Sequence, residues 1–297
     1  MHSNNLSSTY KLVSNYKGNE LLRKLYNELT RTTYGFDFEA WYQDGYWRDK
    51  HIPYSLIYED KMIANVSVNL MEFLTPYGEK KYLQLGTVMT DMNFRKKGLS
   101  RFLLEQILLE WKHKTDGIYL FANDSVLDFY PKFGFKKCVE YQYSKQLNGF
   151  PSFSAKNINM SDPENKKLLF HAILNSKPMS KLTMLRNPEL IMFYVTSFMK
   201  DTVFYIEDLN TYAIIEKSNH TLTLYDIFSS KNHPIDAIIN ALSDNSIDKV
   251  VLNFTPTNTD GFTESILMED NTTLYVLGDN FDFINKDKLM FPSLSHT

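Results

Sequence analysis

Residues 88–100 of the sequence read Val-Met-Thr-Asp-Met-Asn-Phe-Arg-Lys-Lys-Gly-Leu-Ser. They join a segment with strand character, residues 82–90, to a segment whose apolar residues recur every three or four positions, residues 99–114. A strand-to-helix turn exposes unpaired backbone N–H groups at the positive end of the helix dipole, which is a natural phosphate site. Gly98 lets the backbone approach a ligand closely, and the three basic residues before it add positive charge. The stretch therefore predicts a site for a phosphate or pyrophosphate.

A second spaced motif follows the next apolar run, residues 118–122. Asn123, Val126, Tyr130, Gly134 and Phe135 have the spacing Asn-x-x-Val-x-x-x-Tyr-x-x-x-Gly-Phe. The pattern predicts a helix over residues 126–132 and a strand over residues 136–143. A phenol within hydrogen-bond reach can protonate a thiolate leaving group, and an asparagine at this place can cap the predicted helix. A packing role for the tyrosine is the alternative.

Together the two motifs resemble those of the GCN5-related N-acetyltransferase (GNAT) superfamily. Its pyrophosphate loop is Arg/Gln-x-x-Gly-x-Gly/Ala, which residues 95–100 match except that Ser100 stands at the last position. The later motif matches in spacing, with Val126 in place of the usual alanine. The resemblance implies that Tyr130 is the catalytic acid and that acetyl-CoA is bound by Val88, Met89, Thr90, Arg95, Lys96, Lys97, Gly98, Leu99, Ser100 and Asn123.

The reaction that the resemblance implies is direct transfer of an acetyl group from acetyl-CoA to a primary amine of a small molecule or peptide. A main-chain N–H near residues 88–90 would stabilise the charge that develops on the thioester oxygen, and Tyr130 would protonate the thiolate. Two alternatives remain: a non-catalytic acyl-CoA sensor, and a transferase that uses a longer acyl group.

The order of helix and strand patterns predicts two α+β units. Residues 1–147 suit a GNAT-like mixed sheet flanked by helices, residues 148–162 have the Pro- and Gly-containing character of a linker, and residues 163–297 repeat the same element order. The second half has no glycine at the phosphate position, where Pro234 removes a backbone donor. We therefore expect a second, degenerate GNAT-like domain without a CoA loop, as in the tandem-domain branch of the family.

The general base stays open among three carboxylates. Glu72 and Asp91 fall near the strands expected to line the acceptor side, and tandem members can bring their C-terminus, here Thr297, into the site. No pair of histidines has metal-ligand spacing, His113, His171 and His233 are expected to be surface or packing residues, and Cys138 is expected in the core, so no metal site is predicted.

Composition excludes several other classes of protein. The net charge is −3, and the sequence contains no long block of residues of one charge. It therefore predicts no charged surface for nucleic acid or an anionic membrane. A single cysteine precludes an internal disulfide, and neither a signal peptide nor a membrane-spanning run is recognisable. We expect a cytoplasmic enzyme with a small amine or peptide as partner, and homo-oligomerisation is left open.

Overall fold

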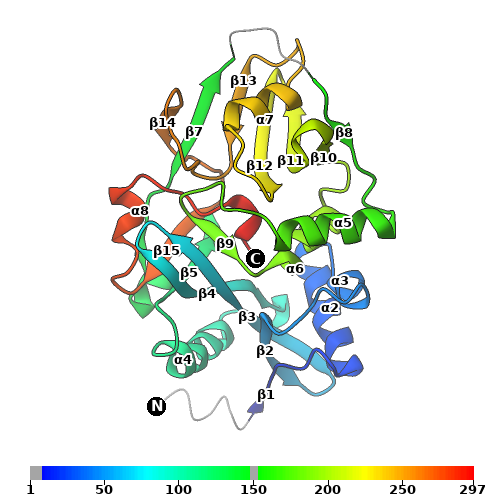
Figure 1. Cartoon of the computed structure of the whole chain (residues 1–297). Helices are drawn as coiled ribbons and strands as arrows, with labels where there is room; N and C mark the ends of the chain where they lie inside the picture. The colour runs from blue at the N-terminus through cyan, green and yellow to red at the C-terminus, as the bar shows by residue number, and fades with distance from the viewer. Residues whose placement is uncertain (1–8, 148–152) are drawn as a thin grey trace.

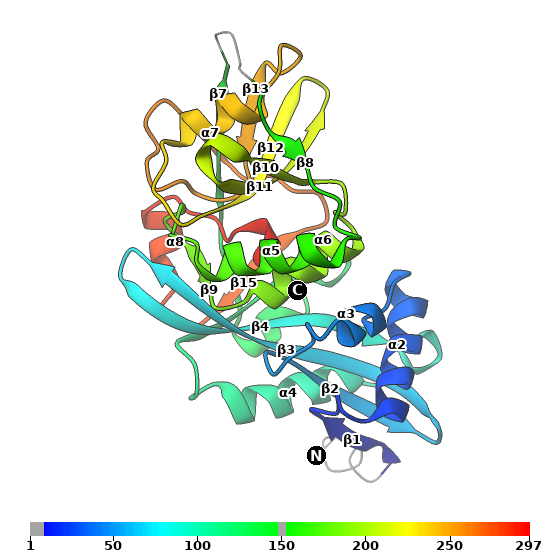
Figure 2. The same cartoon turned by 45° about the vertical axis from the view of Figure 1, so that its right-hand side comes forward.

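The computed structural model describes residues 9–147 and 153–297. The chain forms an α+β fold with two mixed β-sheets, and helices α5 (Pro163–Leu174) and α6 (Pro188–Ser197) lie between them (Figures 1 and 2). The predicted fold class is confirmed. No helix in the described ranges combines the length and hydropathy that crossing a bilayer requires.

The first sheet has the strand order β1-β2-β3-β4-β5-β15-β6, and β9 pairs with residues 72–74 near the C-terminal end of β3. In sequence order its strands are β1 (Lys11–Ser14), β2 (His51–Tyr58), β3 (Lys61–Thr75), β4 (Gly78–Thr90), β5 (Gly117–Ala122), β6 (Lys136–Lys137), β9 (Thr183–Leu185) and β15 (Thr273–Leu277). Strands β4 and β5 are parallel, and α4 (Leu99–Trp111) connects them.

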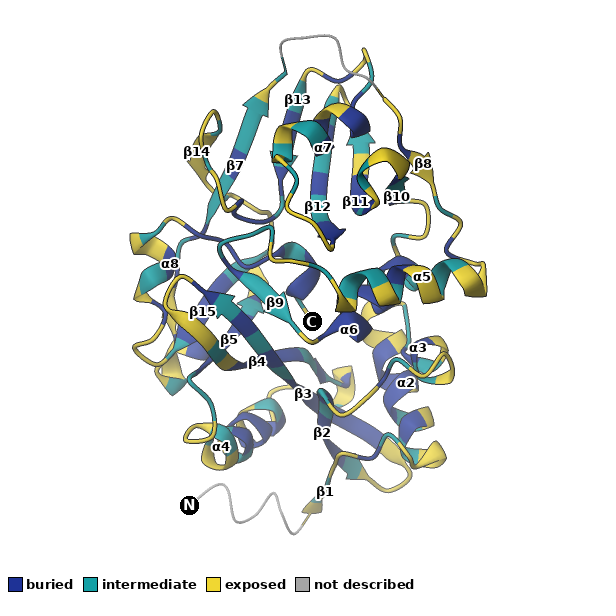
Figure 3. Cartoon of the chain, in the orientation of Figure 1, coloured by how far each residue is buried: buried dark blue, intermediate teal, exposed yellow. Residues whose placement is uncertain are grey.

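Helices cover both faces of this sheet. Tyr26 and Leu29 of α2 (Glu20–Tyr34) pack in one hydrophobic core, while Leu103 and Ile107 of α4 pack in another. Figure 3 shows the consequence for α4, which is buried on one side and exposed on the other. Helix α2 begins at the side-chain cap Asn19, and a short helix α3 (Glu39–Gln43) follows it.

The second sheet has the order β14-β7-β13-β12-β11-β10-β8. Its strands are β7 (Tyr141–Gln146), β8 (Lys156–Asn157), β10 (Val203–Ile206), β11 (Thr211–Ser218), β12 (Thr221–Ser229), β13 (Lys249–Leu252) and β14 (Thr263–Ile266). Helix α7 (Ile235–Leu242) connects the parallel pair β12 and β13, as α4 connects β4 and β5, and the remaining helix α8 (Asp282–Lys286) follows β15. The two halves therefore repeat one α+β unit, as the element order predicted.

The sheets exchange strands across the predicted domain boundary. Strand β7, which precedes it, pairs with β13 and β14, while β15 from the second half pairs with β5. Of the predicted linker, residues 148–152 lie outside the described residues, and Lys156–Asn157 form the edge strand β8. The boundaries at 147 and 163 stay predictions.

The predicted helix over residues 126–132 is wrong. Two short 3₁₀ turns, Asp124–Val126 and Tyr130–Phe133, stand in its place. Pro131 has no N–H to donate to the carbonyl of Leu127, which instead accepts the Tyr275 hydroxyl at 3.0 Å. The single strand predicted over residues 136–143 is in fact two strands, β6 and β7, which belong to different sheets.

Candidate active site

The parallel strands β4 and β5 separate before they end. They pair only from Tyr82–Gly117 to Leu85–Leu120, although β4 continues to Thr90 and β5 to Ala122. Beyond Leu120, β5 pairs with β15 alone. The last residues of β4 thus have no partner on the β5 side, which leaves backbone groups of an interior strand free for a ligand.

A bulge in β4 marks the point of separation. Between the pairs Ser67–Gly86 and Asn65–Met89, β4 has one more residue than β3. Thr87 takes a positive φ of 48°, and its carbonyl accepts a hydrogen bond of 2.8 Å from Asn65 Nδ2. The bulge is therefore held in place by a buried side chain.

The predicted phosphate loop lies at the N-terminus of α4. Gly98 is the residue before the helix and takes the left-handed conformation at φ 79°, and Lys96 is also left-handed at φ 60°. Successive turns of this kind direct backbone N–H groups toward one point, which suits an anion. Ser100, at the position where the family has Gly or Ala, bonds through its hydroxyl to Thr90 Oγ1 at 2.7 Å.

Tyr130 is the first residue of the 3₁₀ turn Tyr130–Phe133. It is only 5% exposed, and burial raises the pKa of its hydroxyl, with a smaller contribution from Tyr34. The phenol is therefore protonated at neutral pH and could donate a proton. Asn123 follows β5 directly, and its Oδ1 accepts a hydrogen bond of 2.6 Å from the Ser125 hydroxyl.

A cavity of about 1270 Å³ joins these features. Every residue predicted for the site lines it except Lys97, whose ammonium lies 4.5 Å from the centre of the Phe94 ring. The structure thus brings both sequence motifs to one cavity, which Tyr130 and basic groups of both motif segments line. These residues fit the pantetheine arm and pyrophosphate of a CoA thioester in kind and arrangement.

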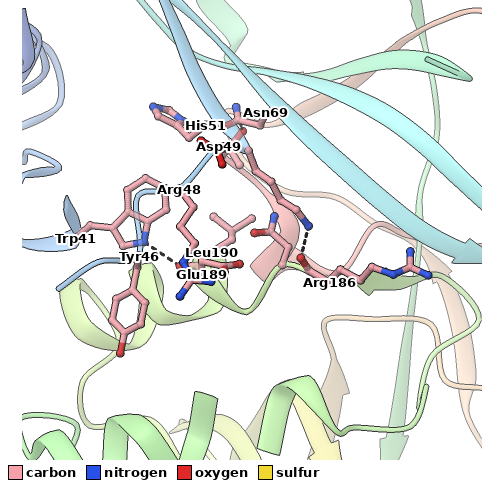
Figure 4. A pocket seen from close by; sticks show the side chains of 12 residues that line it. Trp41, Tyr46, Arg48, Asp49, His51, Asn69, Arg186, Glu189 and Leu190 are labelled. Carbon is pink, nitrogen blue, oxygen red and sulfur yellow. Dashed lines mark hydrogen bonds and ion pairs between the residues drawn. The ribbon is translucent and has the colours of Figure 1, made fainter. Parts of the chain in front are cut away.

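A smaller cavity of about 210 Å³ adjoins the larger one and has a different character (Figure 4). Its charged side chains are paired: Arg48 contacts Glu189 at 2.9 Å, and Lys50 donates to the carbonyl of Arg186. Both cavities share the lining residues Trp41, His51, Asn69, Leu190 and Thr297.

Thr297 lies where the two cavities meet. The C-terminus is beside α6, between the two sheets, in both views of the molecule (Figures 1 and 2). Asn69 Nδ2 donates to Thr297 Oγ1 at 2.8 Å, and Asn69 Oδ1 accepts from His51 Nδ1 at 2.7 Å. His51 Nε2 then accepts the Tyr26 hydroxyl at 3.0 Å, and burial lowers the pKa of His51 to about 4. A neutral, fully bonded network therefore positions the last residue.

The other two carboxylates considered as bases are engaged elsewhere. Glu72 accepts from Arg186 at 2.6 Å, and neither Glu72 nor Asp91 lines either cavity. The hydrogen bond from Lys61 is the main cause that lowers the pKa of Asp91, which also accepts from the Asn93 N–H. Of the three, the structure brings only Thr297 to the cavities.

Sequence reasoning missed the polar network behind the site. Asn65, Ser67 and Asn69 alternate on the apolar strand β3, so their side chains share one face of the sheet. That period of two in an otherwise hydrophobic segment is the signal that could have revealed it. Tyr34 was missed as well; its hydroxyl donates to the carbonyl of Val88 at 2.9 Å, and nothing in the sequence indicates this contact.

Comparison with known proteins agrees with this geometry. Residues 22–135 match the model of the acetyltransferase (GNAT) family, and no curated protein sequence matches the chain. A conserved protein of Enterococcus faecalis V583 described as "Probable N-Acyltransferase" has a similar structure, with TM-score 0.60 and 13% identity over 90% of this chain and 72% of the other.

Two further structures are similar in fold. Eis1 from Mycobacterium abscessus gives TM-score 0.58 at 10% identity, over 89% of this chain and 72% of its own. A GCN5-related N-acetyltransferase from Kribbella flavida gives 0.56 at 12%, over 90% and 71%. The two motifs, the cavity between β4 and β5 and the family match agree: the chain contains, at residues 22–135, a domain of the acetyltransferase (GNAT) family.

Proposed function

We propose that the protein is an N-acetyltransferase that moves the acetyl group of acetyl-CoA directly to a primary amine. One observation carries the proposal: the cavity where β4 and β5 separate has a helix N-terminus with basic residues at one end and the protonated Tyr130 on its wall. The first feature suits the pyrophosphate of CoA, and the second suits a thiolate leaving group.

Each wall of the cavity has a proposed role in the transfer. Backbone N–H groups at the α4 N-terminus bind the pyrophosphate, with Arg95 and Lys96 assisting. A main-chain N–H on β4 between Val88 and Thr90 donates to the thioester oxygen, and Tyr130 protonates the sulfur as the C–S bond breaks. Asn123 hydrogen-bonds the pantetheine arm, as the resemblance implies.

Thr297 is the base candidate that we favour. Its α-carboxylate would hold the attacking ammonium ion at the thioester and accept its proton, directly or through one water molecule. The proposal is supported by the place of Thr297 at the junction of both cavities and by its contact with Asn69. Extending the chain by one glycine removes the carboxylate from this place, so kcat should fall while acetyl-CoA still binds.

The test of the whole proposal combines binding with turnover. Calorimetric titration with CoA should give one site per chain, and release of free thiol from acetyl-CoA should depend on an added amine. Binding without amine-dependent release would favour the non-catalytic sensor. Faster release from hexanoyl-CoA than from acetyl-CoA would favour a transferase for longer acyl groups, and a stoichiometry near two would contradict the single site.

A further inference from the structure

We propose that the acceptor is a primary amine carried on an aromatic or other apolar body, bound in an aromatic chamber formed by Tyr34, Phe36, Phe38, Trp41, Phe193 and Phe198. These six residues line the larger cavity, as Thr297 does. The inference rests on the amine transfer proposed above and assigns its substrate class.

The chamber is built from two segments that are far apart in sequence. Residues 34–41 run from the last residue of α2 into α3, and Phe193 lies in α6 with Phe198 at its end. Their rings form one continuous set: Phe36 contacts Phe198 at 5.2 Å between ring centres, and Phe38 stacks on Phe193 at 5.3 Å. Faces and edges of rings at such distances suit another flat apolar group.

The rings of the chamber differ in exposure. Phe38 and Trp41 are 6% and 7% exposed, whereas Tyr34 and Phe198 are 46% and 56% exposed. Large rings left in water at the rim of a cavity are surface that a ligand can cover with a gain from the hydrophobic effect. The chamber is therefore open to solvent at Tyr34 and Phe198, whereas the buried Trp41 lines both cavities, as Thr297 does.

Charge argues against a polycationic acceptor. Among residues 9–147 and 153–297, no Asp or Glu side chain lines the larger cavity, and its basic residues Arg95, Lys96, Arg101 and Lys132 come from the two motif segments. Two carboxylates line the smaller cavity, and both are paired: Glu189 with Arg48, which Figure 4 shows, and Asp49 with Lys17. Ring faces attract one ammonium ion, but a second charge among them would lack a carboxylate partner.

The competing occupant of the chamber is a long acyl chain of the donor, so the experiment varies the amine and the acyl group separately. The amine arm compares 2-phenylethylamine, propylamine and spermidine at a fixed concentration of acetyl-CoA. We expect kcat/KM to be on the order of 10- to 100-fold higher for 2-phenylethylamine than for propylamine, since a buried phenyl group contributes about that much. Spermidine should be the poorest of the three.

Substitutions in the chamber test whether its rings contact the aryl group of the amine. Phe198→Ala should lower kcat/KM for 2-phenylethylamine by about 3- to 10-fold more than that for propylamine, because the aryl group has more apolar surface to bury against this ring. Phe153→Ala is the matched control: its ring is 47% exposed and lies over Lys217, outside both cavities.

Comparing hexanoyl-CoA with acetyl-CoA as donor, and measuring amine binding by calorimetry, distinguish this inference from its alternatives. Equal efficiency for all three amines together with a preference for hexanoyl-CoA would overturn the inference, since the chamber would then hold the acyl chain. A preference for spermidine would overturn it as well, and in both cases amine transfer itself would stand. If CoA binds but no amine is acetylated, and calorimetry with CoA present detects no 2-phenylethylamine binding, both proposals fail.

Discussion

Gly86 and Thr297 are in direct contact, and the contact requires glycine. A Cβ built on Gly86 would lie 2.5 Å from the backbone oxygen of Thr297 and 2.9 Å from its carbonyl carbon. Gly86 is the residue of β4 just before the bulge, so the last residue of the chain packs against the strand that should present the oxyanion donor. The proposed base and the proposed donor are thus linked through one glycine.

Gly86→Ala should therefore displace Thr297 and lower kcat. The methyl group cannot fit without a backbone shift, whereas the phosphate loop at residues 95–100 lies beyond the end of β4 and keeps its own residues. We expect the Kd for acetyl-CoA to stay within about twofold and kcat to fall at least tenfold, as a misplaced catalytic group can cause. Gly18→Ala is the control, because a Cβ there meets nothing within 4 Å. Unchanged kcat in Gly86→Ala would show that the position of Thr297 is irrelevant to catalysis.

Gly98→Asp tests the phosphate loop. A Cβ at Gly98 meets nothing within 4 Å, so the fold has room for a side chain, although φ 79° strains any residue except glycine. The added carboxylate would repel a pyrophosphate at the helix N-terminus. Gly98→Asn has nearly the same shape without the charge and is the matched control. Calorimetry should show loss of CoA binding in the Asp variant and a smaller loss in Asn; equal affinities for the two variants would place the pyrophosphate elsewhere.

Glu140 is a buried carboxyl group outside the proposed chemistry. It is 7% exposed, lies between β6 and β7, and accepts the Phe291 N–H at 2.8 Å. Burial raises the pKa of this carboxyl to about 8, with Glu269 adding to the effect and the Phe291 bond opposing it. The segment that crosses from one sheet to the other therefore carries a neutral acid at pH 7.

This raised pKa predicts that stability declines with rising pH. Below pH 4 the carboxyl group is protonated in both states; between that value and pH 8 only the folded state holds the proton, so the free energy of unfolding falls as pH rises. The slope from this group is at most about 1.4 kcal/mol per pH unit. Glu140→Gln keeps an acceptor for Phe291 and cannot ionise, so its urea midpoint should exceed that of the wild type at pH 8 more than at pH 5. A difference between the two proteins that is constant across this range would contradict the raised pKa.

Local patterns were enough to predict most elements and both motifs. Residues 99–111 form a helix within the segment whose periodicity indicated one, because apolar spacing acts over a few positions. Asn123 and Tyr130 line the same cavity as the phosphate loop. Their roles in binding and catalysis stay predictions.

Long-range pairing was not predictable in this way. The sequences of residues 141–146 and 273–277 do not indicate which sheet each strand joins. The pattern within a strand predicts which of its side chains are buried, but not which strand pairs with it. The aromatic chamber likewise joins residues near position 36 to residues near 195 through packing alone. Such contacts between distant segments become visible only in three dimensions.

Tyr130→Phe separates a catalytic role of the hydroxyl from packing of the ring. The ring contacts Phe129, Phe135 and Tyr275 at 5.2, 6.0 and 6.1 Å between centres, and phenylalanine keeps these contacts. We therefore expect unchanged thermal stability and nearly unchanged acetyl-CoA affinity.

Turnover should respond differently, because a general acid contributes on the order of 10²- to 10⁴-fold. The kcat of Tyr130→Phe with acetyl-CoA should fall into or near that range, and the loss should shrink with an acyl donor whose leaving group needs no proton. Tyr54→Phe is the control, since its hydroxyl contacts Glu110 at 2.8 Å and lies outside the cavity. Wild-type kcat in Tyr130→Phe, measured where chemistry limits the rate, would mean that Tyr130 only packs and that solvent or another group protonates the thiolate.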